Sequence, residues 1–185
     1  TSPVAGRQPR DDEDSLVQAL RSVEASLFAC ANEVNVQRRF AALVIDLCSE
    51  VVADRRSPTM QQHTLALLAL VAAHSIDSAG LRRIVAVCEQ FGAVAQEDDM
   101  RRNNRRLMHV LNIVATSSAA DTLTLRLIVD LLLKLMMASG MQDDDPQKPL
   151  FFYDAMAMIA GFAHRVAADA GACTNIVRAA HYVVD

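Results

Sequence analysis

Aromatic residues are scarce in this chain of 185 residues, which has no tryptophan, two tyrosines and six phenylalanines. All-β proteins are rich in aromatic and β-branched residues and have regular glycine turns, whereas this sequence has six glycines and is dominated by alanine and leucine. The composition therefore argues against an all-β domain and predicts an all-α one. With 52% hydrophobic residues, the chain is long enough to bury a core as one domain.

Other features are missing as well. The longest uncharged apolar run, residues 65–73, is about half of a membrane span, and no signal peptide opens the sequence. The net charge of −4 argues against a general nucleic-acid coat.

No CxxC pair occurs, so neither a zinc ribbon nor a redox motif is indicated, and the thiols are expected to be reduced core residues. We expect a cytoplasmic or nuclear protein that does not contact a membrane. The four cysteines are Cys30, Cys48, Cys88 and Cys173.

The chain divides into a short tail and one long helical region. Residues 1–14 combine proline, glycine and an acidic run, which predicts a disordered acidic tail. Across residues 15–185, apolar residues recur at spacings of three and four, which predicts a single helical domain. An exposed Asp-rich loop is expected at 140–149. The predicted helices are 14–33, 36–54, 58–75, 79–95, 99–117, 122–138, 149–169 and 174–184, with caps at Ser57, Asp77, Asp121 and Thr174 among the start signals.

The helices repeat an internal pattern. Residues 110–115 (VLNIVA) align with residues 67–72 and again with residues 158–163, and the partner helices follow the same period. Four helical pairs with a period of about 40–48 residues have the length and element order of armadillo and HEAT arrays. The sequence therefore predicts an α–α superhelix of about four antiparallel helical pairs.

Over about residues 15–184 the chain resembles the armadillo and HEAT families. Residues 110–115 look like the Leu–Asn–Ile–Ala region of an armadillo ligand-facing helix. His109 or Met108 stands where an aromatic residue often precedes that region, and Gly80 is the one clear turn glycine. These departures leave HEAT-like pairs, or the middle domain of translation initiation scaffolds, as alternatives. The resemblance implies a protein that binds other proteins.

A stripe of small and polar residues is left over once each helix has buried its apolar sides, and we call it the ladder. Such a surface lets a second backbone approach and offers hydrogen bonds, as a concave groove for a peptide or helix requires. Alanines on a helix face also suit a tight seam between helices, so both interpretations stay open. The ladder comprises Gln62, Ala66, Ala69 and Ala73; Arg105, His109, Asn112 and Thr116; Tyr153, Ala157, Ala160 and His164; and, in a first copy, Arg21, Ala25, Phe28 and Asn32.

The helices that alternate with the ladder helices have a different set of residues, mostly charged, that are not needed for the core. This set predicts an ordinary solvated face with ion pairs inside each helix. Its members are Asp46, Glu50, Glu89, Gln90, Arg126, Asp130 and Lys134.

The densest basic cluster is RRNNRR, residues 101–106. On a helix its four arginines would lie within about a turn and a half, and guanidinium groups pair well with carboxylates or phosphates. The acidic residues 97–99 immediately upstream would neutralise the cluster under the simpler interpretation. An acidic peptide, a phosphorylated motif or an RNA backbone is the anion expected if the cluster binds one, although no aromatic residues interleave the arginines for base stacking.

No catalytic or metal-binding motif is present. The five histidines occur singly, and the run 143–145 (DDD) lacks the alternating ligands of a calcium loop. Cys48 and Cys88 fall at equivalent repeat positions in apolar stripes, as packing residues do. We expect no enzyme activity, metal or cofactor; an all-α ligand-binding bundle or enzyme with an apolar cavity lined by Met and Phe side chains is the least favoured alternative. The methionines expected in core runs are Met108, Met136, Met137, Met156 and Met158.

These observations predict a non-enzymatic protein-interaction module that holds a peptide or helix of a partner on the concave face. The alternative is an RNA-associated helical domain that uses RRNNRR on phosphates. The apolar last helix, 174–184, predicts either further repeats or a homodimer through the C-terminal helix pair. The predicted partner-binding residues are Gln62, Arg101, Arg105, His109, Asn112, Thr116, Tyr153 and His164.

Overall fold

A computed structural model of the chain describes residues 15, 18–19, 21–23, 25–26, 34–53, 58–74, 77–94, 97–138 and 148–184. The predicted tail 1–14 and most of the predicted loop 140–149 lie outside these residues. All the regular structure within them is helical, as the sequence predicts. The helices are α2 (Val34–Ala53), α3 (Pro58–Ala73), α4 (Ser78–Val94), α5 (Glu97–Thr116), α6 (Thr122–Ala138), α7 (Lys148–Val166) and α8 (Ala170–Val184).

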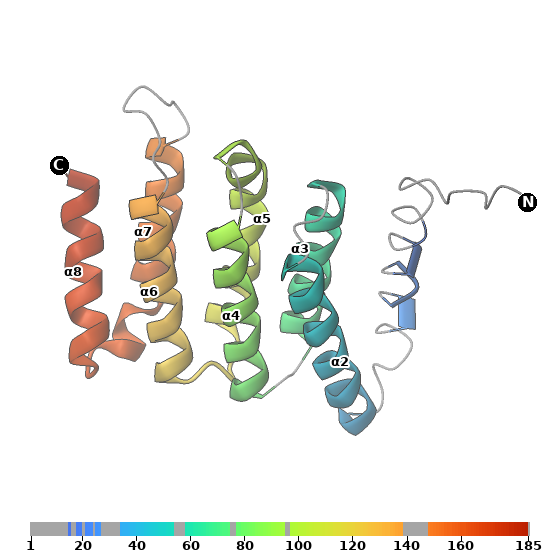
Figure 1. Ribbon diagram of the computed structural model, residues 1–185. Coiled ribbons are helices and arrows are strands. Elements are labelled where there is room, and N and C mark those ends of the chain that lie inside the picture. Colours follow the sequence, from blue (N-terminus) through green and yellow to red (C-terminus); the bar gives the residue numbers. More distant parts are fainter. Residues whose placement is uncertain are drawn as a thin grey trace, which may run out of the picture.

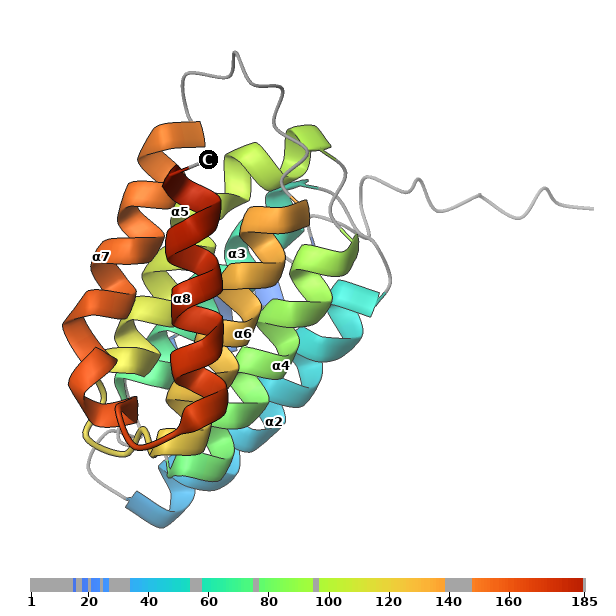
Figure 2. The same ribbon diagram turned by 90° about the vertical axis from the view of Figure 1, so that its left-hand side faces the viewer.

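The helices stand side by side in two layers (Figure 1). One layer, called here the odd layer, contains α3, α5 and α7; the other, the even layer, contains α2, α4, α6 and α8. Seen from the α8 end, the two layers run away from the viewer as two rows (Figure 2). Each helix contacts its neighbours in its own layer and its partner in the other layer. This confirms the predicted all-α superhelical arrangement of antiparallel pairs.

A single apolar core fills the space between the layers. Ile84 of α4 and Ile128 of α6 occupy equivalent repeat positions, and both have no exposed surface. Burying a side chain of this size stabilises the fold by about 1.5–3 kcal/mol. Val85 and Val129 are likewise 3% and 0% exposed, whereas the equivalent Val177 of α8 is 56% exposed, because no further described helix packs beyond α8. Pairing of α8 with another copy or with further repeats stays a prediction.

Each even-layer helix from α4 onward begins with an aspartate cap. The carboxylate oxygens of Asp77, Asp121 and Asp169 accept hydrogen bonds from the backbone N–H three residues on, each at 2.8 Å. The cap satisfies an N–H group that the first helical turn leaves without a partner. The same cap therefore recurs once per repeat, and Asp121 also accepts a hydrogen bond from the buried Thr124 hydroxyl at 2.6 Å.

The predicted helix boundaries are wrong in one region. The predicted helix 149–169 ends at Val166, and α8 begins at Ala170 with Asp169 as its cap, four residues before the predicted start at Thr174. Alanine-rich sequence runs through this turn, so the apolar pattern hides the break. Gly80, the expected turn glycine, lies inside α4 instead, where its N–H meets the Asp77 carboxylate.

The charged set of the even layer forms ion pairs between helices, and not within them as predicted. Arg83 of α4 pairs with Asp46 of α2, and Lys134 of α6 pairs with Glu89 of α4. Asn175 of α8 donates a hydrogen bond to Asp130 of α6 at 2.6 Å. The two ion pairs are largely exposed, so each contributes at most about 1 kcal/mol, whereas Asn175 and Asp130 are half-buried. Together they connect all four helices of the layer.

Removing an aspartate cap should destabilise the fold. We expect Asp77→Ala and Asp169→Ala each to lower the free energy of unfolding by about 0.5–2 kcal/mol. Asp121→Ala should cost more, because it also leaves the buried Thr124 hydroxyl without its acceptor. Chemical denaturation measures these changes. The control is Asp154→Ala, because Asp154 is exposed and does not cap a helix. Equal stabilities for all four variants would contradict the capping role.

Candidate functional site

The ladder lies on the outer surface of the odd layer. Its α5 residues Arg105, His109, Asn112 and Thr116 are all exposed, and so are Ala66 and Ala73 of α3. On α7, Tyr153, Ala157, Ala160 and His164 are exposed too, and Tyr153 reaches 72%. Gln62 and Ala69 are half-buried. Ala66, Ala73, Ala157 and Ala160 are therefore not part of a helix–helix seam, whereas Ala69 packs partly against the core, and the odd layer presents small residues to solvent.

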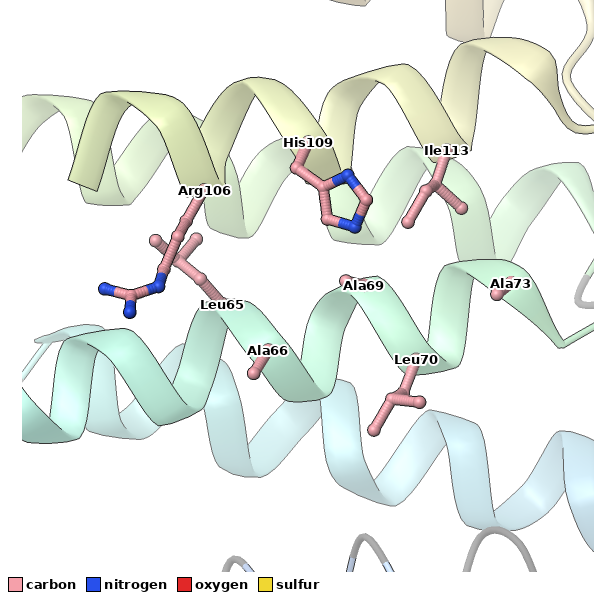
Figure 3. A pocket seen from close by; sticks show the side chains of 8 residues that line it. All are labelled: Leu65, Ala66, Ala69, Leu70, Ala73, Arg106, His109 and Ile113. Atoms are coloured by element: carbon pink, nitrogen blue, oxygen red, sulfur yellow. The ribbon is translucent and has the colours of Figure 1, made fainter.

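A first hollow of about 350 Å³ lies between α3 and α5. Figure 3 shows the His109 ring and the Ile113 side chain projecting from α5 toward α3, where the alanines leave room. We call it the α3–α5 hollow. Because short side chains line the α3 side, the larger side chains of α5 do not close it. It is lined by Leu65, Ala66, Ala69, Leu70, Ala73, Arg106, His109 and Ile113.

A second hollow of about 390 Å³ lies between α5 and α7, and we call it the α5–α7 hollow. His109 lines both hollows, so its imidazole stands on the ridge between them. The second hollow is the more polar of the two, with an amide and opposite charges in its wall. It is lined by Arg105, Met108, His109, Asn112, Asp154, Ala157 and Met158.

The structure splits the RRNNRR cluster. Asn103 and Asn104 face inward, with 3% and 7% of their surface exposed, and the Asn103 amide donates to Gln61 of α3 at 2.8 Å. Arg105 and Arg106 are exposed. The side chains of Arg101 and Arg102 lie outside the described residues. The part that is described is thus a pair of adjacent arginines at the mouths of two hollows.

These two arginines differ from several in the even layer. Arg82, Arg83 and Arg126 pair with aspartates. No ion pair or hydrogen bond joins Arg105 or Arg106 to any side chain that the structure describes. Their guanidinium groups are available to an external anion.

The end of α5 is held by an arginine that the sequence did not single out. Arg165 of α7 donates to the carbonyl of Ala115 at 2.8 Å and to that of Ala120 at 2.5 Å. Carbonyls at a helix C-terminus have no partner within the helix. This half-buried side chain therefore holds the C-terminal end of α5 against α7.

The structure brings together Arg105, His109 and Asn112, which share the α5–α7 hollow. Gln62, Thr116, Tyr153 and His164 lie on the same face but do not line either hollow, and the Arg101 side chain lies outside the described residues. The sequence analysis placed Arg106 in the RRNNRR cluster but not on the ladder, and it missed Asp154 as a lining residue. A signal for Asp154 existed, since the repeat shift that carries Arg105 to Tyr153 also carries Arg106 to Asp154.

Of the three cysteines that the structure describes, Cys48 and Cys88 are buried packing residues, as their sequence positions predict, whereas Cys173 is half-buried and not the core residue expected. Cys48 and Cys88 have no exposed surface. Burial raises the pKa of both thiols from 9.0 to about 12, and the nearby Cys48 adds to the effect on Cys88. Thiols with so high a pKa are protonated and unreactive at neutral pH.

Of the methionines expected in the core, Met136 is buried but Met137 is 62% exposed, because it falls on the outer face of α6. Met156 and Met158 are half-buried. In the part of the chain that is described, no group of three His, Cys, Asp or Glu side chains could hold a metal ion. Within the same residues, no helix is long and apolar enough to cross a membrane.

Comparison of the chain with models of protein families, with curated proteins and with solved structures gave no match. The geometry of the odd layer therefore carries the functional argument alone.

Alkaline pH should destabilise the fold. Between pH 9.0 and about 12 the unfolded chain loses thiol protons that buried Cys48 and Cys88 retain, so stability falls as pH rises. Lys134 acts in the same direction, because its hydrogen bond to Glu89, and then the charge of Glu89, raise its pKa. Melting temperatures measured across this range should decline, and Cys88→Ala should flatten the decline. An unchanged slope in that variant would contradict the assignment to the thiols.

Proposed function

We propose that the chain is a non-enzymatic protein-interaction module, built as a short armadillo- or HEAT-like array, that binds a peptide or helix of a partner on the odd layer. The observation that carries the proposal is the pair of hollows on either side of His109. Ligand pockets span about 300–1,000 Å³, and these two hollows adjoin one another at His109, with alanines in the wall of each.

The even layer supports this assignment by contrast. Its polar groups connect α2, α4, α6 and α8 to one another, so they stiffen the array. A surface that is rigid before binding loses less entropy when a partner docks. The odd layer supplies the unpaired polar groups and the small side chains that let another backbone approach.

The double variant Arg105→Ala/Asn112→Ala tests the proposal. Both side chains are exposed, so the free energy of unfolding should change by no more than about 0.5 kcal/mol. Binding to a partner identified by affinity purification, and then measured with both purified proteins, should weaken about tenfold or more. The exposed Arg39→Ala on α2 is the matched control and should bind as the wild type does.

Two outcomes would contradict the proposal. Loss of folding in the double variant would show that these residues belong to the core. Binding of RNA through this face, with an affinity that falls steeply as salt rises, would favour the RNA-associated alternative.

A further inference from the structure

The α3–α5 hollow combines an apolar wall with one charged group. Leu65, Leu70 and Ile113 supply its large apolar side chains. Arg106 is the only Asp, Glu, Lys or Arg among its described lining residues, and α3 contains none of these four residue types. Figure 3 shows the Arg106 guanidinium at one end of the hollow and Ile113 toward the other.

We propose that the partner segment is acidic and amphipathic: an apolar side chain enters the α3–α5 hollow over Ala66 and Ala69, and an adjacent carboxylate pairs with Arg106. This rests on the proposed function and names the chemistry of the partner. On a helical segment, residues three or four apart lie about 5–6 Å from each other on one face. An Asp or Glu one turn from a Leu, Ile, Met or Phe therefore matches the hollow.

The charge of Arg106 is not cancelled locally. It makes no ion pair and no side-chain hydrogen bond among the described residues. Solution ions screen charges over about 8 Å at physiological ionic strength. A partner carboxylate that enters at this end of the α3–α5 hollow would thus meet an unpaired positive charge within that distance.

The α5–α7 hollow fits an acidic residue less well. Asp154 lines it and offsets Arg105. His109 and Asn112 can hydrogen-bond to a partner backbone there. The two hollows therefore bind different parts of the partner. The α3–α5 hollow takes its apolar side chain and its carboxylate, and the α5–α7 hollow contacts its backbone.

Selection of a randomised displayed-peptide library against the intact chain tests the proposal. Enriched peptides should carry Asp or Glu within one helical turn of an apolar residue. A synthetic consensus peptide should lose about tenfold to a hundredfold in affinity for Arg106→Glu, measured by fluorescence anisotropy. The peptide with Lys in place of its acidic residue should recover affinity for that variant. Arg39→Glu, an exposed arginine on α2, is the charge control and should bind the consensus unchanged.

A second variant tests the apolar contact. Ala66 is exposed, so Ala66→Phe should fill the hollow without unfolding the protein and should weaken the consensus peptide about tenfold. Ala86→Phe, at an exposed alanine of the even layer, is the matched control and should bind normally.

The outcomes separate the two proposals. Peptides that bind the odd layer, are weakened by Ala66→Phe and ignore Arg106→Glu would overturn the acidic partner and leave the proposed function standing. Peptides that ignore every odd-layer variant would overturn both. A random-sequence RNA oligonucleotide that binds the wild type, loses binding in Arg106→Glu and displaces the consensus peptide would assign Arg106 to phosphates and overturn the peptide segment.

Discussion

The constraint on which the whole structure depends is that no helical pair can bury its apolar residues alone. Ile84, Ile128 and Leu132 reach zero exposure because each lies between its partner helix and the neighbouring pair. Stacking therefore creates one continuous core, and each added pair completes the burial of the pair before it. The same constraint leaves Val177 exposed at α8, where no further described helix covers it.

The two layers use their polar residues differently. Even-layer groups such as Arg83 and Lys134 pair across adjacent helices, and the aspartate caps complete the first turns of α4, α6 and α8. Odd-layer groups such as Arg105 and Arg106 have no such pairs with the side chains that the structure describes. A rigid scaffold with unpaired groups on one side suits recognition, since the binding surface is formed before a partner arrives.

Much of the helical pattern was predictable because helix formation and capping depend on residues close in sequence. Helix 122–138 was predicted with the bounds that α6 has, and Asp77 and Asp121 were predicted as caps. Asp169 was missed because alanines on both sides continue the apolar pattern through the turn. Ion pairs such as Lys134 with Glu89 were missed because they join residues far apart in the sequence, which local periodicity cannot bring together.

The sequence by itself determined that the chain is helical and where several of its helices begin and end, because these follow from spacings of residues close in the chain. Only the tertiary structure decided that most of the described part of the ladder is exposed, with Gln62 and Ala69 half-buried. It also decided that Arg106 shares a hollow with Ala66 and Ile113, while Asn103 and Asn104 turn inward. The burial of a helix face depends on which helices lie alongside it. The same alanine pattern is compatible with a buried face or an exposed one, and only the positions of the neighbouring helices decide between them.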